Sequence, residues 1–297
     1  MAAKAVRVQV EGHEVRLSNL DKVLYPATGF TKGQVIDYYT RAAPVLLPHL
    51  RGRALTLKRY PNGVDEGHFY EKQKPSHAPE WVQSEPIEAG GRMIDFVLCE
   101  DLPTLVWLAN LADLELHPSL ALAKDPDTPT VLAFDLDPGP PAGLAECCQV
   151  AILLRDTLSQ LGLDSYPKTS GSKGMQLYVP LNADTSYDET KPFANGLARL
   201  LEKQHPKLIV SAMKKELRHG KVFIDWSQND RHKTTVGVYS LRARERPTVS
   251  TPLAWQEVET GDADALVFES GELLERVEEL GDPFEPVLAS RQELPDL

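Results

Sequence analysis

Residues 131–140 read VLAFDLDPGP, a mostly apolar run that ends in Asp135, Leu136, Asp137 and a Pro-Gly-Pro stop. In a strand, residues i and i+2 point to the same face, so the two carboxylates would lie about 6–7 Å apart along it. Like charges this close raise each other's pKa unless a cation lies between them, and hard divalent cations prefer carboxylate oxygens. The stretch therefore indicates a metal site, although Asp-Pro-Gly is also typical of a surface turn.

A second carboxylate follows an apolar run in KVFIDWSQN, residues 221–229, where Asp225 comes directly after Ile224. Three Asp residues at strand ends suit a two-metal site, in which the ions stabilise the oxygens of an in-line phosphoryl transfer. The alternative is that Asp225 is an isolated residue at the end of its strand.

The loop TSGSKG, residues 169–174, combines two glycines, three hydroxyl groups and Lys173. Successive backbone N–H groups in such a turn can bind an anion, and the lysine adds a positive charge. The upstream glycine and the Lys-Ser/Thr pair of a P-loop are missing. An ordinary Gly-Ser turn remains the alternative interpretation.

Basic and aromatic side chains form two further candidate sites. Arg242 and Arg244 in YSLRARER would project from one face of a strand shortly after Lys233, and guanidinium groups suit phosphates. In RYPNGVDEGHFYEKQ, Lys58 and Arg59 precede Phe69 and Tyr70, which could stack on bases. Exposed surface charge and buried aromatic packing are the respective alternatives.

The composition is that of a soluble globular protein, with 297 residues, 42% hydrophobic and 25% charged. This length suits one large domain or two small ones. The three cysteines, Cys99, Cys147 and Cys148, have no disulfide or zinc-site spacing, and no apolar run reaches the roughly 18 residues of a membrane span. The N-terminus has no secretion signal. We therefore expect a reduced, cytoplasmic setting without membrane contact.

The net charge of −11 is unevenly distributed along the chain. Residues 251–297 hold 13 acidic and two basic residues, and their spacing around ESGELLERVEEL predicts a solvated amphipathic helix. Residues 205–246 hold ten basic and four acidic residues. A local positive surplus beside a carboxylate site favours binding of a polyanion despite the acidic total.

Hydrophobic periodicity predicts strands and helices without a regular βαβ rhythm, which favours an α+β fold. We expect a hairpin over 6–19, helices over 31–50, 102–116, 144–163 and 188–206, and strands over 54–73, 165–181, 221–229 and 234–242, with Thr31 as a helix N-cap and a glycine loop between the strands of 165–181.

Taken in order, LSNLDKVLYPATGFTK, KRYPNGVDEGHFYEKQ, LELHP, FDLDPG, TSGSKGMQLYVPL, KVFIDWSQN and YSLRAR resemble the polymerase domain of bacterial ligase D, in the archaeo-eukaryotic primase superfamily. The likeness runs from about residue 14 to residue 290. It implies mixed and antiparallel sheets flanked by helices around a central cleft. It also implies one domain over 1–297, made of two packed halves with a seam near 124–141 and an acidic segment at 251–297, as in a stand-alone actinobacterial or mycobacterial paralogue.

The resemblance assigns a role to each matching residue. Catalytic metal ligands would be Asp135, Asp137 and Asp225; nucleotide-binding residues would be His117, Ser170, Ser172, Lys173, Gln176, Lys233, Arg242 and Arg244, with His117 favouring a ribose 2′-OH; a DNA 5′-phosphate would bind Lys22 and Lys32; and template or primer DNA would contact Lys58, Arg59, Phe69, Tyr70 and Arg218.

Gln176 departs from the family pattern, which usually has His at this position. A neutral amide still donates a hydrogen bond but carries no charge or titratable proton. We therefore expect weaker nucleotide binding here, and a lower KM for nucleotide in a Gln176→His variant, more so at pH 6 than at pH 8.

The resemblance implies a template-directed nucleotidyltransferase that extends a 3′-OH at gaps or broken DNA ends, favours ribonucleotides and uses two Mn²⁺ or Mg²⁺ ions. Gapped or broken DNA and NTP or dNTP would be its substrates, an ATP-dependent DNA ligase and Ku its candidate partners, and the nucleoid its place of action. Two alternatives remain: a non-catalytic DNA-end adaptor, and a phosphatase of the haloacid dehalogenase class. The phosphatase needs Thr or Val two residues after the second Asp, where this chain has Gly139.

Overall fold

The computed structural model describes residues 5–295, which form two compact units. Unit 1 holds the chain up to Ser119 with Val236–Val249 and Glu269–Gly281, and unit 2 holds Leu120–Thr235, Ser250–Phe268 and the chain from Asp282 onward. The chain first passes between the units at Ser119 and Leu120, ahead of the expected seam at 124–141. The acidic segment is divided between both units.

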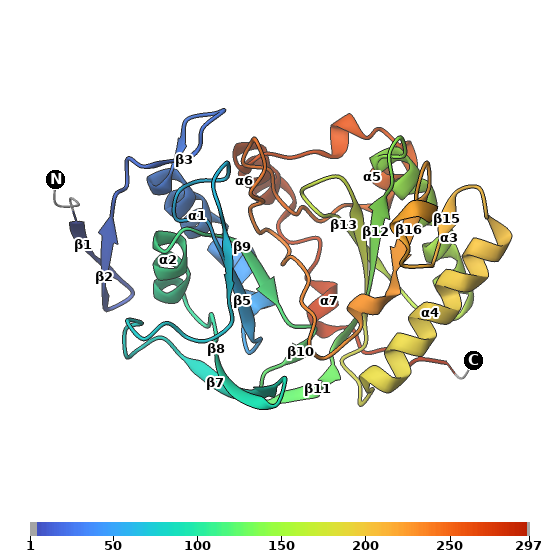
Figure 1. Cartoon of the computed structure of the whole chain (residues 1–297), viewed down its shortest axis with the longest axis horizontal. Helices are drawn as coiled ribbons and strands as arrows, with labels where there is room; N and C mark the ends of the chain where they lie inside the picture. Colours follow the sequence, from blue (N-terminus) through green and yellow to red (C-terminus); the bar gives the residue numbers. More distant parts are fainter. Residues whose placement is uncertain (1–4, 296–297) are drawn as a thin grey trace. The chain divides into compact units, whose positions relative to one another are not determined.

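Unit 2 is built on a five-stranded sheet with the order β13-β14-β12-β16-β15. Its strands are Tyr166–Thr169, Met175–Pro180, Val131–Pro138, Val222–Asp225 and Ile209–Val210 in that order. Every neighbouring pair is antiparallel except β15 and β16, which are parallel. This mixed, mainly antiparallel sheet confirms the α+β prediction, and Figure 1 shows it beside α3 and α4.

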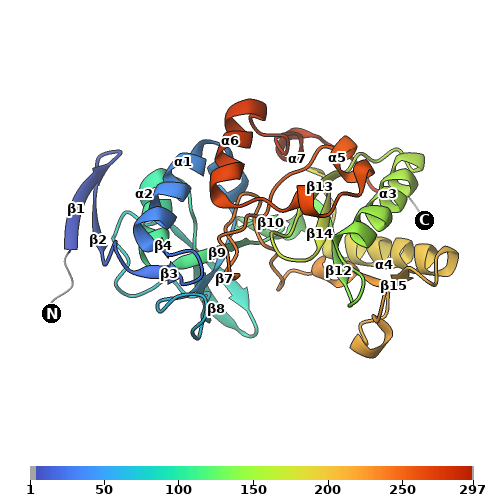
Figure 2. The ribbon, with the colours of Figure 1, turned by 90° about the horizontal axis from the view of Figure 1, so that it is seen from above.

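Alternation along β12 decides which face of the sheet is packed and which carries polar groups. Leu132, Phe134 and Leu136 are fully buried in one apolar cluster with side chains of α3 (Leu144–Gln160) and α4 (Tyr187–Gln204). Both helices contact β12, as the view in Figure 2 also shows. Asp135 and Asp137 have the opposite parity, so their side chains lie on the face that these helices leave uncovered.

Short elements complete unit 2. The hairpin of β10 (Ala121–Leu122) and β11 (Asp125–Pro129) precedes β12, and α5 (Trp255–Thr260) contacts α3 and β13. The last helix, α7 (Pro286–Ala289), contacts β14. Single-turn 3₁₀ helices occur at Lys215–Leu217, Trp226–Gln228 and Asp264–Leu266.

Unit 1 contains a three-stranded antiparallel sheet with the order β6-β5-β9. The strands are Phe69–Glu71, Leu55–Arg59 and Asp113–Pro118, and the helices are α1 (Lys32–Leu50), α2 (Leu102–Asn110) and α6 (Ser270–Leu280). Three hairpins accompany them: β1 (Ala5–Val10) with β2 (His13–Ser18), β3 (Val23–Tyr25) with β4 (Phe30–Thr31), and β7 (Ser84–Ala89) with β8 (Arg92–Val97).

The start of α1 confirms the predicted N-cap. The Thr31 hydroxyl accepts the Gln34 N–H at 3.3 Å, and the Gln34 side chain accepts the Thr31 N–H at 2.8 Å. This reciprocal capping satisfies two of the N–H groups that a helix start leaves without partners. Both α2 and α6 pack on α1, and the buried Leu273 and Leu274 of α6 give the acidic helix its apolar side.

Two sequence predictions about strands and helices were wrong. The helix expected over 102–116 ends at Asn110, because Ala112 takes a left-handed φ of 57° and the chain continues as β9. The strand expected over 234–242 does not form, because Tyr239 has a φ of 64° and only an isolated bridge joins Leu241 to Val249. Arg242 and Arg244 therefore lie in irregular chain rather than on a strand face.

Among residues 5–295, no helix is both long and apolar enough to cross a membrane.

Candidate functional site

The predicted site residues divide between the two units. Unit 2 carries Asp135, Asp137, Asp225, Ser170, Ser172, Lys173, Gln176, Lys233 and Arg218, and unit 1 carries Lys22, Lys32, Lys58, Arg59, Phe69, Tyr70, His117, Arg242 and Arg244.

The three predicted catalytic carboxylates lie on neighbouring strands of the unit 2 sheet. Asp135 and Asp137 share one face of β12, and Asp135 is the register partner of Asp225 on β16. Directly opposed residues of an antiparallel pair have Cβ atoms about 4.5–5.5 Å apart, so two carboxylates meet across the ladder. The sequence prediction that Asp225 ends a buried strand is confirmed, since β16 stops there and a 3₁₀ turn follows.

Protein donors hold both partners of this pair. Asp225 Oδ1 accepts the Ser227 N–H at 2.9 Å and its hydroxyl at 2.6 Å, and Oδ2 accepts Gln228 Nε2 at 2.9 Å. Asp135 Oδ1 accepts a single bond, from Gln176 Nε2 at 3.1 Å. Asp225 is thus fixed by its own turn, whereas Asp135 depends on a side chain of the neighbouring strand.

Asp137 is engaged by Arg218, whose Nη1 lies 2.9 Å from Asp137 Oδ2. The guanidinium also lies over the Phe223 ring, 3.8 Å from its centroid. The loop that carries Arg218 is attached to the end of β12 at Gly139, whose N–H donates to Lys221 O at 2.8 Å. A Cβ at Gly139 would lie only 2.0 Å from Arg218 O, so this contact requires glycine.

Electrostatics single out Asp135 among the three. Desolvation raises the pKa of Asp135 to about 6, and the charges of Asp225 and Asp137 add to the rise, against the opposing bond from Gln176. A carboxylate that repels two others is stabilised when a cation approaches.

The donor chemistry fits a hard divalent cation, because all three side chains offer carboxylate oxygens. The arrangement does not yet form a closed ligand set, however. Within residues 5–295, no three His, Cys, Asp or Glu side chains converge closely enough to hold an ion. Arg218 supplies the positive charge at Asp137 instead, so an ion that binds Asp137 has to displace the guanidinium.

The loop 169–174 is closed by its own side chains. Ser170 Oγ accepts the N–H groups of Ser172 at 3.3 Å and Gly174 at 3.2 Å, and Gly171 donates to Thr169 Oγ1 at 3.4 Å. Gly174 approaches β12 so closely that a Cβ would lie 2.3 Å from Leu136 O. The backbone nest that the sequence suggested is therefore largely occupied, which leaves the exposed Lys173 and the Ser172 hydroxyl as the groups able to meet an anion.

Lys233 is linked to Asp225 through one hydroxyl group. Its Nζ lies 2.5 Å from Ser227 Oγ, which in turn bonds Asp225 Oδ1 at 2.6 Å. The structure thus brings this predicted nucleotide-binding lysine next to the carboxylate site of unit 2.

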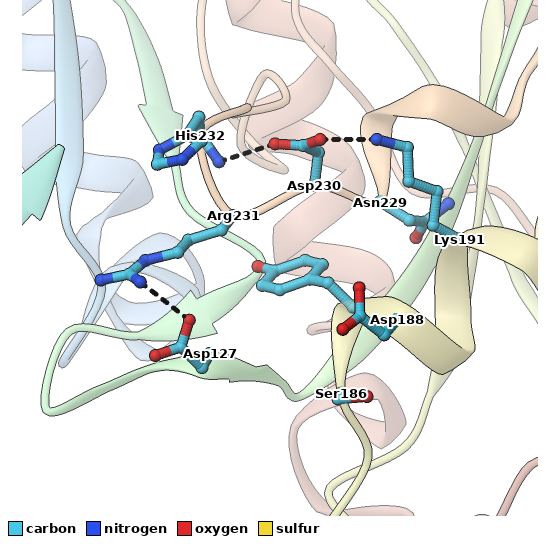
Figure 3. A pocket seen from close by; sticks show the side chains of 9 residues that line it. Asp127, Ser186, Asp188, Lys191, Asn229, Asp230, Arg231 and His232 are labelled. Atoms are coloured by element: carbon cyan, nitrogen blue, oxygen red, sulfur yellow. Dashed lines mark hydrogen bonds and ion pairs between the residues drawn. The ribbon is translucent and has the colours of Figure 1, made fainter. Parts of the chain in front are cut away.

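A separate hollow of about 310 Å³ opens in unit 2 between the start of α4 and residues 229–232. Figure 3 shows two ion pairs in it: Lys191 Nζ lies 2.6 Å from Asp230 Oδ2, and Arg231 Nη1 lies 3.0 Å from Asp127 Oδ1. None of the three predicted catalytic residues lines it. It is therefore not the predicted site.

In unit 1, Glu115 joins several predicted residues into one cluster, although the sequence analysis did not single it out. Its Oε2 lies 3.0 Å from Lys58 Nζ, 3.0 Å from His117 Nε2 and 3.4 Å from Arg242 Nε. Burial by itself would raise the pKa of Glu115, but the His117 hydrogen bond and the nearby cations hold it well below the usual value. The only sequence signal was its alternation with His117 in LELHP.

Burial of His117 favours the neutral form of its imidazole. Burial lowers its pKa below 6.5, and the bond to Glu115 offsets this only in part. Because Nε2 lies 3.0 Å from the Glu115 carboxylate, the neutral ring carries its proton on Nε2 and leaves Nδ1 as an acceptor.

Lys22 and Lys32 form a cationic pair in unit 1. Lys22 Nζ donates to Pro61 O at 2.5 Å, whereas the 6%-exposed Lys32 has only a long contact of 3.4 Å to Ser18 Oγ. Burial lowers the pKa of Lys32 to about 8, and repulsion from Lys22 and Arg59 contributes. The causes of this shift are burial and neighbouring positive charges, and an anion bound here would offset both.

Exposed aromatic groups lie on β6, next to the predicted basic residues. Phe69 is 44% and Tyr70 is 59% exposed; Arg59 lies 5.1 Å from the Phe69 ring centroid and Lys58 lies 5.6 Å from that of Tyr70. Tyr70 also borders a hollow of about 470 Å³ with Glu71, Lys72, Gln73, Arg92, Met93 and Ile94. Lys72 follows β6 directly in the chain, whereas Arg92 and Met93 reach this hollow only because the fold brings β8 beside β6.

Comparison with known proteins gives a family match over most of the chain. The family model described as the LigD primase-polymerase domain matches residues 31–284. A multifunctional non-homologous end joining protein LigD of Mycolicibacterium smegmatis is 44% identical over 275 residues, which cover 92% of this chain and 36% of that protein. A bifunctional LigD of Bacillus subtilis is 35% identical, over 91% of this chain and 44% of its own length.

A solved structure agrees with this match. The polymerase domain from Mycobacterium tuberculosis ligase D, in complex with DNA, superposes with a TM-score of 0.88 and 39% identity, over 94% of this chain and 99% of that one. The chain therefore spans less than half the length of these LigD proteins but nearly all of the solved domain.

Proposed function

Because the chain belongs to the primase-polymerase domain family of ligase D, a family of DNA-directed nucleotidyltransferases, we propose that it extends a 3′-OH by template-directed addition of nucleotides during DNA repair. The single observation that carries this proposal is the Asp135–Asp225 pair with Asp137 on the uncovered face of the unit 2 sheet. Carboxylates of this kind serve in-line phosphoryl transfer by concentrating negative charge where cations are needed.

Asp135, Asp137 and Asp225 would hold divalent cations, with Mn²⁺ or Mg²⁺ as the candidates. When bound, such ions lower the pKa of an attacking hydroxyl and neutralise charge on the leaving group. The chain's own cations would oppose the remaining triphosphate charge: Lys173 from its exposed loop, and Lys233 beside Asp225. Arg242 and Arg244 are further candidates for contacts with phosphate groups.

We propose that the sugar of the incoming nucleotide is read by His117. The neutral ring donates from Nε2 to Glu115 and keeps Nδ1 as an acceptor. An acceptor fixed in this way suits the hydrogen of a ribose 2′-OH, which supports the expected preference for ribonucleotides.

We propose that DNA binds through the basic and aromatic groups of unit 1. The Lys22–Lys32 pair would take the 5′-phosphate of the downstream strand, since two neighbouring ammonium groups favour a dianion there. Phe69 and Tyr70 would stack on template bases, and Lys72 and Arg92 would extend this surface toward the phosphates. Arg218 would leave Asp137 when primer and ions arrive.

Broken or gapped DNA with a 5′-phosphate is therefore the proposed substrate. The M. smegmatis relative is named as a non-homologous end joining protein. By that likeness we propose that this chain acts on chromosomal DNA in the nucleoid, together with an ATP-dependent DNA ligase and Ku.

Primer extension on gapped DNA tests the proposal. The substrate carries a 5′-phosphate downstream, and the reaction contains Mn²⁺ with each ribo- or deoxynucleotide. We expect incorporation by the wild type, loss of incorporation in Asp137→Ala, and DNA affinity near wild type in that variant. Asp184→Ala, which changes an exposed Asp of the same unit, is the matched control and should retain activity.

The two alternative functions predict different results in this assay. A DNA-end adaptor would bind phosphorylated ends but incorporate nothing, and a phosphatase would release phosphate without extending the primer. Full activity in Asp137→Ala would show that the metal assignment is wrong.

A further inference from the structure

A fully buried lysine is separated from the carboxylate pair by a single strand, β14. Lys168 on β13 is 0% exposed; its Nζ lies 2.6 Å from Gln176 Oε1 and 2.7 Å from Ser250 Oγ. Its ammonium also lies 5.4 Å from the Tyr178 ring centroid. Burying an ammonium is costly even when it is hydrogen-bonded, so a lysine at this point calls for an explanation.

Lys168, Gln176, Asp135 and Asp225 form one row across four strands. Gln176 is the register partner of both Lys168 and Asp135, and Asp135 is the partner of Asp225. Their side chains are joined in the same order, since Lys168 donates to Gln176 and Gln176 donates to Asp135. The row runs from a cation through a neutral amide to two anions.

The lysine decides which way the amide of Gln176 faces. An ammonium group has three donors and no acceptor, so it can face only Oε1. The amino group of Gln176 must then face Asp135, where Nε2 lies 3.1 Å from Oδ1. With the amide reversed, two donors would meet at Lys168 and two acceptors would meet at Asp135.

Building on the proposed function, we propose that Lys168 is a positioning residue for metal binding, which acts on Asp135 through Gln176. The amide holds Asp135 Oδ1, so the carboxylate keeps one orientation and presents Oδ2. Lys168 also places a full positive charge behind Gln176, which is itself neutral. Gln176 stands where the family usually has His, so the lysine provides a charge that the amide lacks. Bonds to metal ligands from outer residues commonly change metal affinity by about 10–100-fold when removed.

A double-mutant cycle on Mn²⁺ affinity tests this proposal. The variants are Lys168→Met, Gln176→Met and the double variant, and Mn²⁺ is titrated into the protein alone, without DNA or nucleotide. We expect each single variant to bind Mn²⁺ about tenfold or more weakly. The double variant should be weakened by clearly less than the two single effects combined, because Lys168 acts chiefly through the amide and its direct charge effect on Asp135 is the smallest of the influences on that carboxylate.

A merely structural role for Lys168 predicts another pattern. Its loss would lower the unfolding midpoint and leave Mn²⁺ affinity within twofold, or the two effects would add in the double variant. Either result overturns the proposal. If Lys168→Met does not fold, the Mn²⁺ affinity of Gln176→Met provides the test. A wild-type affinity in Gln176→Met would also overturn the proposal.

Lys191→Met is the matched control, since Lys191 belongs to the same unit and pairs with Asp230 rather than with the row. It should leave Mn²⁺ affinity unchanged. In primer extension, Lys168→Met should lower kcat with little change in KM for DNA. The proposed function is tested separately by Asp137→Ala. If Asp137→Ala loses activity but the Lys168 and Gln176 variants show no coupling in Mn²⁺ affinity, the role of Lys168 is wrong and the proposed function stands.

Discussion

Asp135 on β12 and Asp225 on β16 are directly opposed across an antiparallel pair, so the sheet carries two like charges at one rung. Such a pair destabilises a sheet, and neither side chain has a cationic partner among its hydrogen bonds. The pKa of Asp135 is raised, chiefly by desolvation and further by the charges of Asp225 and Asp137, and this rise reflects the energetic cost of the pair. Keeping the two carboxylates together therefore lowers the stability of the folded protein.

Replacing Asp135 by Asn should therefore stabilise the protein at pH 7 while abolishing nucleotide incorporation. The folded pKa of about 6 lies above the ordinary 3.8, so between these values the folded state holds a proton that the unfolded chain has lost. Wild type consequently loses stability from this group as pH rises through that window. We expect a gain of about 1–2 kcal/mol in the free energy of unfolding at pH 7, shrinking toward pH 4.

Denaturant unfolding of wild type and Asp135→Asn at pH 4, 5, 6 and 7 measures this difference. Asp184→Asn serves as the control, because this exposed residue should show no pH-dependent gain. A gain for Asp135→Asn that is equal at every pH would contradict the electrostatic explanation.

Removing the Arg218 guanidinium should tighten Mn²⁺ binding by the free protein. Arg218 pairs with Asp137 at 2.9 Å, and an ion must break that pair to reach the carboxylate. Arg218→Met keeps most of the packing on Phe223 and loses the charge. An ion pair of about 1 kcal/mol corresponds to roughly fivefold in affinity.

Titration of Mn²⁺ without DNA measures the Arg218 effect. Lys215→Met removes an exposed charge from the same loop without touching Asp137 and should change affinity less. Equal tightening in both variants would mean that general loop charge, rather than the ion pair, opposes the metal.

His117→Ala should reduce the preference for ribonucleotides over deoxynucleotides. The lost acceptor contributes about 0.5–1.5 kcal/mol to a 2′-OH contact, or roughly two- to tenfold in the ratio of kcat/KM values. Steady-state kinetics with matched ribo- and deoxynucleotides measures the ratio. His77→Ala, an exposed histidine of unit 1, should leave it unchanged, and an unchanged ratio in His117→Ala would remove His117 from sugar selection.

Recognition of a 5′-phosphate should weaken as the pH rises above about 8. The pKa of Lys32 is lowered to about 8, chiefly by burial, so its positive charge is progressively lost above that pH. Binding of gapped DNA with and without the 5′-phosphate, measured from pH 7 to 9.5, gives the phosphate preference. We expect this preference to fall with pH in wild type and to be small at every pH in Lys22→Ala/Lys32→Ala; a wild-type preference independent of pH would refute the role of Lys32.

Local patterns were sufficient to predict the elements that carry the carboxylates. The apolar run that leads into Asp135 and Asp137 predicts the buried strand β12, and elsewhere in the chain Thr31 was predicted as the N-cap of the helix that the structure shows as α1. The order of motifs then identified the family, which the comparison confirms.

Contacts between distant segments could not be predicted in this way. Glu115 gathers Lys58 and Arg242 from far along the chain, and Lys168 meets Ser250 only because residues 250–252 lie beside β13. The failed strand at 234–242 has the same origin, since Gly237 N–H donates to Leu116 O at 2.8 Å instead of joining a sheet partner of its own. Single-residue periodicity contains no information on such pairings.

Gly139 has a consequence for protein engineering. The Arg218 loop and the aspartate strand meet at this residue without space for a methyl group, so they cannot be exchanged independently between relatives. A longer or differently shaped loop grafted onto this scaffold has to reproduce the backbone path of residues 218–221 over Gly139. Conversely, a side chain at position 139 would push the backbone at Arg218 away and so move the guanidinium without altering any carboxylate.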